Sequence, residues 1–275
     1  MGGNNKGLIK KMIGFIIIMG IIALIFMLLS AIKSSRSNMY VNVDTIELVQ
    51  LEEPEDGDTI AIIDTSLGEI RAVLYPEYSP NAVQNFIELA ESGYYDNTYV
   101  FHSDSGVYAA AGSKNKDGTM PDGYDTSREL VERELHQNLW PFKGAICMLN
   151  TTVDYGLFDA IIGGETYYNG SRFALLNTIE FTDDVIEELV ESSESQELAD
   201  AFIENGGIPN FSQQMTIIGQ AYEGLDVIEE LSSLETEGVD EDDDTYKIPV
   251  EDIMIISVEI SEYSSEEAET TQEND

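Results

Sequence analysis

The stretch Asn169-Gly170-Ser171-Arg172-Phe173 decides the fold, because of the blocks that stand before and after it. Upstream lie Thr65-Ser66-Leu67-Gly68-Glu69-Ile70 and Tyr99-Val100-Phe101-His102. Downstream come the run 217–228 (IIGQAYEGLDVI) and the closing run 253–260 (IMIISVEI). Short apolar runs of this kind recur along the chain and are separated by turn residues. They predict a mainly β protein whose strands close into a barrel.

Local patterns predict a hairpin and two helices around these strands. The β-favouring runs 60–65 and 69–75 are joined by a turn at Gly68, which is typical of a hairpin. Ser79 can cap a helix that starts at Pro80 and stops at Gly93. A second short helix is expected after Gly224.

The order of these blocks resembles the cyclophilin-type peptidyl-prolyl isomerases, over Thr59 to Ile260. The resemblance implies a closed eight-stranded β-barrel capped by two helices, in a domain that spans 59–260. It also implies that a groove for proline-containing segments lies on the outer wall of the barrel.

The activity of that family depends on an arginine that this chain lacks. Turning an X-Pro bond costs about 18–20 kcal/mol, because amide resonance must be broken. In the family, the arginine after Phe-His stabilises the twisted state by donating to the prolyl nitrogen. The block reads Phe101-His102-Ser103 here, so the resemblance puts Ser103 at the arginine position and predicts weak activity.

The other groove positions are carried over one by one. Val107, Tyr108 and Ala110 stand where the family has phenylalanine, methionine and glutamine. Arg172 replaces a glutamine, Phe173 is kept, and Ala174 replaces a phenylalanine. The resemblance therefore implies the following substrate-binding residues: Phe101, His102, Val107, Tyr108, Ala110 and Phe173.

Arg172 is a candidate for the missing catalytic cation. It stands next to Phe173, where the family places a side chain on the groove floor. We hypothesise that its guanidinium supplies the donor from the opposite wall of the groove. The alternative is a surface ion pair with one of the many acids, which would contribute under about 1 kcal/mol.

Residues 177–211 form an acidic insert relative to the family. Val185, Ile186, Leu189 and Val190 have helical spacing, as do Leu198, Ala201 and Phe202, and Thr182 or Asp183 can cap. Two short amphipathic helices are expected, ending at Gly206-Gly207. The insert either reshapes or covers the groove, or it is a tolerated surface insertion.

The N-terminal region predicts a membrane anchor. Residues 12–32 carry no charge and are long enough for a helix to span the bilayer core. Lysines in 1–11 favour a cytoplasmic N-terminus, so a single-pass protein of the cell membrane with an extracytoplasmic domain is expected. A cleaved signal peptide is the alternative.

The segments that flank the domain read as unstructured. Residues 33–58 are expected to be a linker with one weak strand at 40–43, and the acidic tail 261–275 is expected to be disordered. The acidic run 240–244 reads as a solvated loop.

Composition limits the partners and the chemistry. The formal net charge of -40 repels phosphate backbones, which argues against nucleic acid as a partner. Cys147 is the only cysteine of the chain; it lies in an apolar run and is expected to be buried. Two histidines without spaced ligand partners argue against a metal site, and no cofactor is expected.

The sequence leaves three functions open, the third of which is a purely structural adaptor without a peptide groove. The favoured one is a membrane-anchored peptidyl-prolyl isomerase that acts weakly on proline-containing segments of exported proteins. The alternative is a catalytically inactive, cyclophilin-like binding module that serves as a chaperone or a scaffold. The client protein and the oligomeric state stay open.

Overall fold

The computed structural model describes residues 41–119, 130–152, 167–193, 195–240 and 243–266. The expected cytoplasmic N-terminus (1–11), the expected membrane span (12–32) and residues 267–275 of the expected tail lie outside these ranges. Over the ranges described, no helix has both the length and the apolar character that crossing a bilayer requires.

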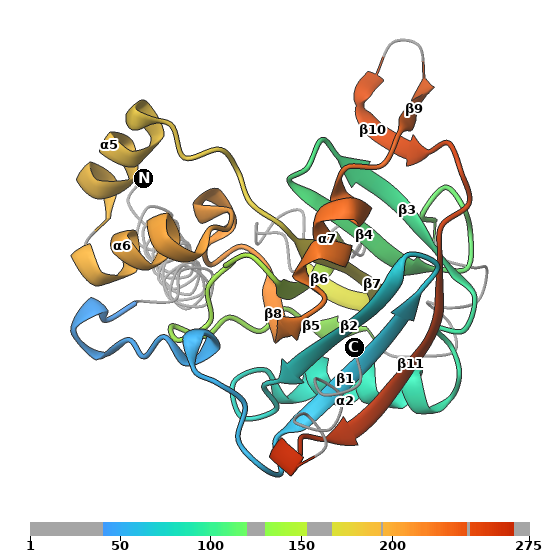
Figure 1. Cartoon of the computed structure of the whole chain (residues 1–275), viewed down its shortest axis with the longest axis horizontal. Coiled ribbons are helices and arrows are strands. Elements are labelled where there is room, and N and C mark those ends of the chain that lie inside the picture. Colours follow the sequence, from blue (N-terminus) through green and yellow to red (C-terminus); the bar gives the residue numbers. More distant parts are fainter. Residues whose placement is uncertain (1–40, 120–129, 153–166, 194, 241–242, 267–275) are drawn as a thin grey trace, which may run out of the picture. The chain divides into compact units, whose positions relative to one another are not determined.

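Nine strands of the described chain form one sheet (Figure 1). They are β1 (Thr59–Thr65), β2 (Gly68–Leu74), β3 (Thr98–Asp104), β4 (Tyr108–Ser113), β5 (Val131–Glu132), β6 (Ala145–Thr152), β7 (Tyr167–Leu176), β8 (Thr216–Glu223) and β11 (Met254–Glu262). Their order is β4-β3-β11-β1-β2-β8-β6-β7-β5, and β4 also pairs with β7. This extra pairing closes eight strands into the expected barrel. The short strand β5 pairs only with β7 and lies outside the closed ring.

The closure between β4 and β7 requires a glycine. Gly112 has φ +88°, a region that residues with a Cβ rarely adopt. A Cβ at this position would lie 2.7 Å from the carbonyl oxygen of Ser171 and 3.1 Å from the ring of Phe173. The two backbones therefore approach each other here as only glycine allows.

Two helices cover the barrel, as the sequence predicts: α2 (Pro80–Glu91) and α7 (Leu225–Ser232). Ser79 precedes α2, but its side chain makes no capping hydrogen bond to the helix. Instead, Ser79 Oγ donates to the carbonyl of Ile217 at 2.8 Å, so the buried hydroxyl ties the start of α2 to β8.

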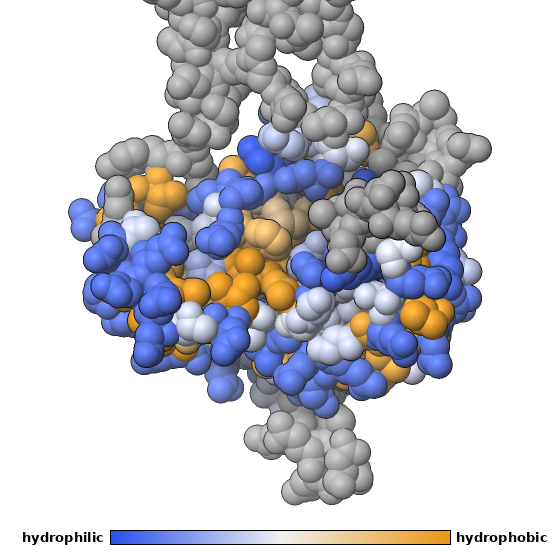
Figure 2. Space-filling model, turned by 90° about the horizontal axis from the view of Figure 1, so that it is seen from above, coloured by the Kyte–Doolittle hydropathy of each residue, from blue (hydrophilic) through white to orange (hydrophobic). Residues whose placement is uncertain are grey.

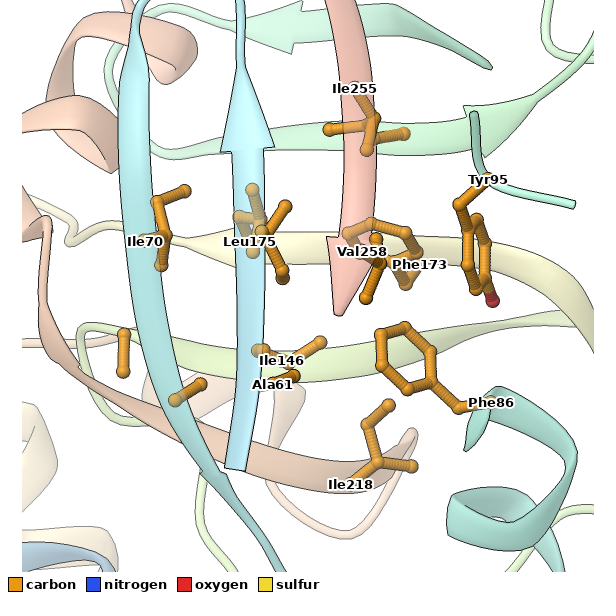
Figure 3. Packing of buried hydrophobic residues seen from close by; sticks show 14 of the residues in the cluster. Ala61, Ile70, Phe86, Tyr95, Ile146, Phe173, Leu175, Ile218, Ile255 and Val258 are labelled. Atoms are coloured by element: carbon orange, nitrogen blue, oxygen red, sulfur yellow. The ribbon is translucent and has the colours of Figure 1, made fainter. Parts of the chain in front are cut away.

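The barrel interior is a packed core (Figure 3). Phe173 from β7 meets Phe86 of α2 and Tyr95 edge-on, with ring centroids 5.7 and 5.6 Å away. All three rings are fully buried, and the Tyr95 hydroxyl donates to the Ser171 carbonyl at 3.0 Å. Because side chains fill the inside, a binding site has to be built on the outer wall.

The acidic insert folds into two helices, as expected: α5 (Asp183–Ser192) and α6 (Gln196–Asn205). Thr182 Oγ1 accepts a hydrogen bond from the Val185 amide, and Ser195 Oγ accepts one from the Leu198 amide. These are N-terminal caps. Leu198 and Phe202 of α6 are buried in a small separate cluster with Trp140.

The described part of the expected linker packs on the domain. Residues 41–51 contain two 3-10 helices, Val43–Thr45 and Val49–Leu51, and the weak strand expected around 40–43 does not appear in 41–43. Gln50 is buried, and its Nε2 donates to Gln220 Oε1 on β8 at 2.9 Å. This buried hydrogen bond fixes the segment to the barrel.

The C-terminal region is more ordered than its composition suggests. Strands β9 (Thr236–Asp240) and β10 (Asp243–Pro249) form a hairpin around the acidic run that we expected to be a loop. Strand β11 continues past Ile260, and the Tyr263 ring packs edge-on against Tyr222 at 5.6 Å. The folded region therefore extends beyond the boundary at 260 that the sequence suggested.

Candidate functional site

A β-bulge in β3 decides which of its side chains face outward. Val100 pairs with Ala111, whereas His102 pairs with Ala110, so β3 has one more residue than β4 at this point. Val100 and Ala111 belong to the barrel core. Since neighbouring residues of a strand face opposite sides, Ala110 and its partner His102 face the outer wall.

Ser103 faces the other way. It pairs with Ala109, which lies in the core, and its side chain is only 1% exposed. Its Oγ accepts a hydrogen bond from the Leu234 amide, just after α7, at 3.2 Å. The β3 side chain beside Ala110 is therefore His102, whereas the resemblance led us to expect the functional position at Ser103.

His102 is held as a neutral ring. Its Nδ1 accepts a hydrogen bond from the Lys247 amide at 3.2 Å, so the proton of the neutral ring is carried by Nε2. Burial lowers the pKa of His102 below the ordinary histidine value. Its ring lies 5.3 Å from that of Tyr108, at 43°. His102 thus presents an uncharged aromatic side chain to this wall at neutral pH.

An apolar surface lies next to this pair. We call it the outer apolar patch; its partly exposed members are Val107, Tyr108, Leu149, Phe211 and Met215, over a buried floor of Cys147, Ala174 and Leu176. The rings of Tyr108 and Phe211 meet edge-on at 5.9 Å. Hydrophobic residues also interrupt the hydrophilic surface in the view of Figure 2. Such a surface suits an apolar ring such as that of proline.

Phe101 and Phe173, which the family resemblance named as substrate-binding residues, have a structural role instead. Phe173 is completely buried inside the barrel, opposite in direction to the neighbouring Ala174 of the outer wall. Phe101 lies at the bulge of β3 and is 2% exposed. The ligand contact that we expected of Phe173 is not available to it, because its side chain points into the core.

Arg172 lies on the outer face of β7, two residues before Ala174. Same-face neighbours on a strand are about 7 Å apart, which is within the reach of an arginine side chain. Its Nη1 donates to the Gly118 carbonyl at 2.8 Å, in the turn after β4. Ion pairs within the described ranges involve Arg71, Lys116 and Lys143, and Arg172 makes none there. Arg172 therefore braces this turn.

Other members of the patch were not identified from the sequence. Leu149 and Phe211 belong to the patch, although the resemblance named neither. Alternation along β6 was the available signal, because Ala145, Cys147 and Leu149 share the face opposite to the core residues Ile146 and Met148. Cys147 is buried, as expected, and burial raises the pKa of its thiol.

Comparison with known proteins supports the same family on three grounds. The family model for "Cyclophilin type peptidyl-prolyl cis-trans isomerase/CLD" matches residues 60–159. A protein of Staphylococcus aureus (strain USA300), named "Putative peptidyl-prolyl cis-trans isomerase", is 26% identical over 211 residues, which cover 77% of this chain and 96% of that protein. A protein of Staphylococcus epidermidis with the same name is 25% identical over the same length.

Solved structures agree on the fold. A crystal structure of a cyclophilin type peptidyl-prolyl cis-trans isomerase from Cryptosporidium parvum matches 76% of this chain and 99% of its own, with a TM-score of 0.52 and 18% identity. A second structure of that protein, obtained in the presence of the dipeptide Ala-Pro, matches with a TM-score of 0.50. Together with the closed barrel and the sequence matches, these similarities support the cyclophilin family for this chain.

Proposed function

We propose that this chain binds proline-containing segments on the outer apolar patch and isomerises them slowly. The observation that carries the proposal is the patch itself, which lies beside the outward pair His102 and Ala110 on a barrel of this family. Tyr108 and Phe211 supply aromatic surface for a pyrrolidine ring, and the small side chain of Ala174 forms part of the floor. Most of the binding free energy would come from apolar contact.

Slow catalysis follows from the charges around the patch. The twisted X-Pro bond develops a lone pair on nitrogen, which a nearby cation stabilises. Strand β3 carries no arginine, and its outward ring, His102, is neutral. Arg172 is the cation that we assign to this role, and its bond to Gly118 would have to loosen or be shared for it to reach the prolyl nitrogen.

A second candidate function is peptide binding without isomerisation, as in a chaperone or a scaffold. One observation favours it: the Arg172 guanidinium already donates to the Gly118 carbonyl, at 2.8 Å. Preorganised donors catalyse only when they are held close to the productive geometry, within about 0.5 Å. In that case, Arg172 serves only to hold the turn.

We further propose that residues 12–32 anchor the protein as a single-pass membrane protein whose domain is extracytoplasmic. The support for this location is the uncharged apolar run and the lysines before it. The clients would then be exported proteins that fold outside the cytoplasm. Protease accessibility of the domain in intact cells, compared with lysed cells, tests this orientation.

The two candidate functions are separated by exchange NMR on a proline peptide with a catalytic amount of protein. An isomerase accelerates cis-trans exchange, and Arg172→Ala reduces that acceleration at least tenfold. The matched control is Arg71→Ala, because Arg71 is also half-buried but lies on β2 in an ion pair with Glu69. If peptide lines broaden without faster exchange, the chain only binds. If neither changes, both candidates are wrong.

A further inference from the structure

The acidic insert encloses a hollow that the proline-binding proposal does not use. A cavity of about 380 Å³ lies between α5, α6 and the N-terminal segment. Its apolar walls include Val185 and Leu189 of α5, together with Leu198 and Phe202 of α6. No member of the outer apolar patch lines it. A cavity of this size lies within the range of binding sites for small ligands and side chains.

Helix α5 has an apolar face that the fold leaves partly unpacked. α5 has no buried residue, whereas α6 buries Leu198, Ala199, Ala201 and Phe202. Val185 and Leu189 are one turn apart, and both face the cavity. An amphipathic helix normally buries such a stripe, so this one is suited to packing against a partner.

A buried polar group lies in the same wall. Trp140 lines the cavity and is only 5% exposed. Its Nε1 has no hydrogen-bond partner within the described residues. A buried indole N–H usually finds an acceptor, because leaving it unpaired costs free energy. A bound peptide would supply that acceptor through a backbone carbonyl.

The charge around the cavity limits what can enter. Residues 177–211 contain ten acidic side chains and no lysine, arginine or histidine. Glu188 lines the cavity itself. Such a field attracts cationic segments and repels anionic ones. A ligand with apolar side chains and positive charge therefore matches both the apolar wall of the cavity and the acidic side chains around it.

We propose that this cavity is a docking site for an extended segment of a partner protein in which apolar side chains are flanked by lysine or arginine. The apolar side chains pack on Val185 and Leu189, a backbone carbonyl accepts from Trp140 Nε1, and the flanking cations lie near Glu188. This site requires no proline, and its lining residues differ from those of the outer apolar patch. It gives the insert a role in selecting clients.

Trp140 is the chain's only tryptophan, so its fluorescence reports on the cavity without a label. The probe is the end-blocked peptide Lys-Leu-Phe-Leu-Lys, and the control is Glu-Leu-Phe-Leu-Glu, both titrated into the full chain in detergent. We expect a saturable change in Trp140 emission with the lysine peptide, and at least tenfold weaker binding of the glutamate peptide. Higher salt should reduce that difference.

Two neighbouring variants on α5 locate the site. Leu189→Gln changes the cavity wall, whereas Val190→Gln changes a side chain that is 39% exposed and does not line the cavity. We expect Leu189→Gln to weaken binding at least fivefold and Val190→Gln to leave it within twofold. Because neither residue is buried, both variants should fold, and an unchanged melting temperature verifies this.

Trp140→Phe removes the indole donor but keeps an aromatic ring in the wall. Measured by calorimetry, it should weaken binding about three- to tenfold, the value of one net hydrogen bond. The proposal is overturned if the two peptides bind equally, if neither binds, or if both α5 variants lose binding alike. It is also overturned if adding the peptide does not change Trp140 emission while the substitution Lys33→Glu does. That result would mean that the chain's own N-terminal segment fills the cavity.

Discussion

The hydroxyl of Ser103 accepts a hydrogen bond from the backbone amide of Leu234 at 3.2 Å, so this side chain belongs to the contact between β3 and the segment after α7. It pairs with Ala109, which lies in the barrel core, so it does not face the outer wall. The residue that the family resemblance marked as the site of lost catalysis therefore has a structural role. The outward position on β3 is held by His102 instead.

Ser103→Ala should therefore destabilise the protein without affecting its function. Removing the hydroxyl leaves the Leu234 amide without this partner in a partly buried place, which costs about 1 kcal/mol. Urea denaturation measures the loss, and peptide binding should stay unchanged. The control is Ser233→Ala, an exposed neighbour of Leu234. Equal stability of the two variants would contradict the assigned role.

The closure of the barrel can be tested at Gly112. Gly112→Ala places a Cβ 2.7 Å from the Ser171 carbonyl and also strains a positive φ. Overpacking of this kind costs about 1–3 kcal/mol beyond the strain. Gly57→Ala is the matched control, because Gly57 has φ +96° and nothing within 4 Å of its Cβ position. We expect Gly112→Ala to lower the free energy of unfolding more than Gly57→Ala does; similar losses would mean that β4 and β7 are not in close contact.

The buried histidine gives stability a pH dependence. Burial lowers the pKa of His102 below 6.5, so the unfolded chain takes up its proton before the folded chain does. The contribution of the neutral ring is therefore complete above about pH 6.5 and is lost as the pH falls below that value. The free energy of unfolding should fall more steeply from pH 7 to about 5.5 in the wild type than in His102→Asn. Parallel curves would show that His102 is not buried as a neutral ring.

Cys147 should resist thiol reagents. Its side chain is fully buried in the floor of the outer apolar patch, and burial raises the pKa of the thiol, so little thiolate forms. We expect a chromogenic disulfide reagent to label Cys147 at the rate of global unfolding, and therefore faster in urea. A bound proline peptide should slow the labelling further. Rapid labelling of the native chain would contradict the burial of the floor.

The sequence predicted those parts of the fold that depend on local chemistry. Pro80 and Gly93 bound α2, Thr182 caps α5, and Gly206 ends α6, because each of these signals acts within a few residues. The sequence did not predict which side chains of the candidate site face outward. The single extra residue at Phe101 shifts the alternation of β3, and no local pattern in the run 98–104 marks that bulge.

Contacts between distant segments could not be predicted either. The segment 41–51 looks like a linker by composition, yet Gln50 is bonded to Gln220, which is 170 residues away. The insert cavity likewise depends on Trp140 meeting helices that begin more than forty residues later. Such contacts depend on the tertiary fold, which brings together segments that are far apart in the sequence.

The central claim is that proline segments bind on the outer wall beside His102 and Ala110, and alanine methyl NMR tests it most directly. With ¹³C-labelled alanine in the full chain, a proline peptide should shift the methyl signals of Ala110 and Ala174, which face that wall. The signals of Ala61 and Ala111, which lie inside the barrel, should move much less. If the outer-wall methyls stay still at saturating peptide, or if only signals from the insert move, the outer apolar patch is not the binding site.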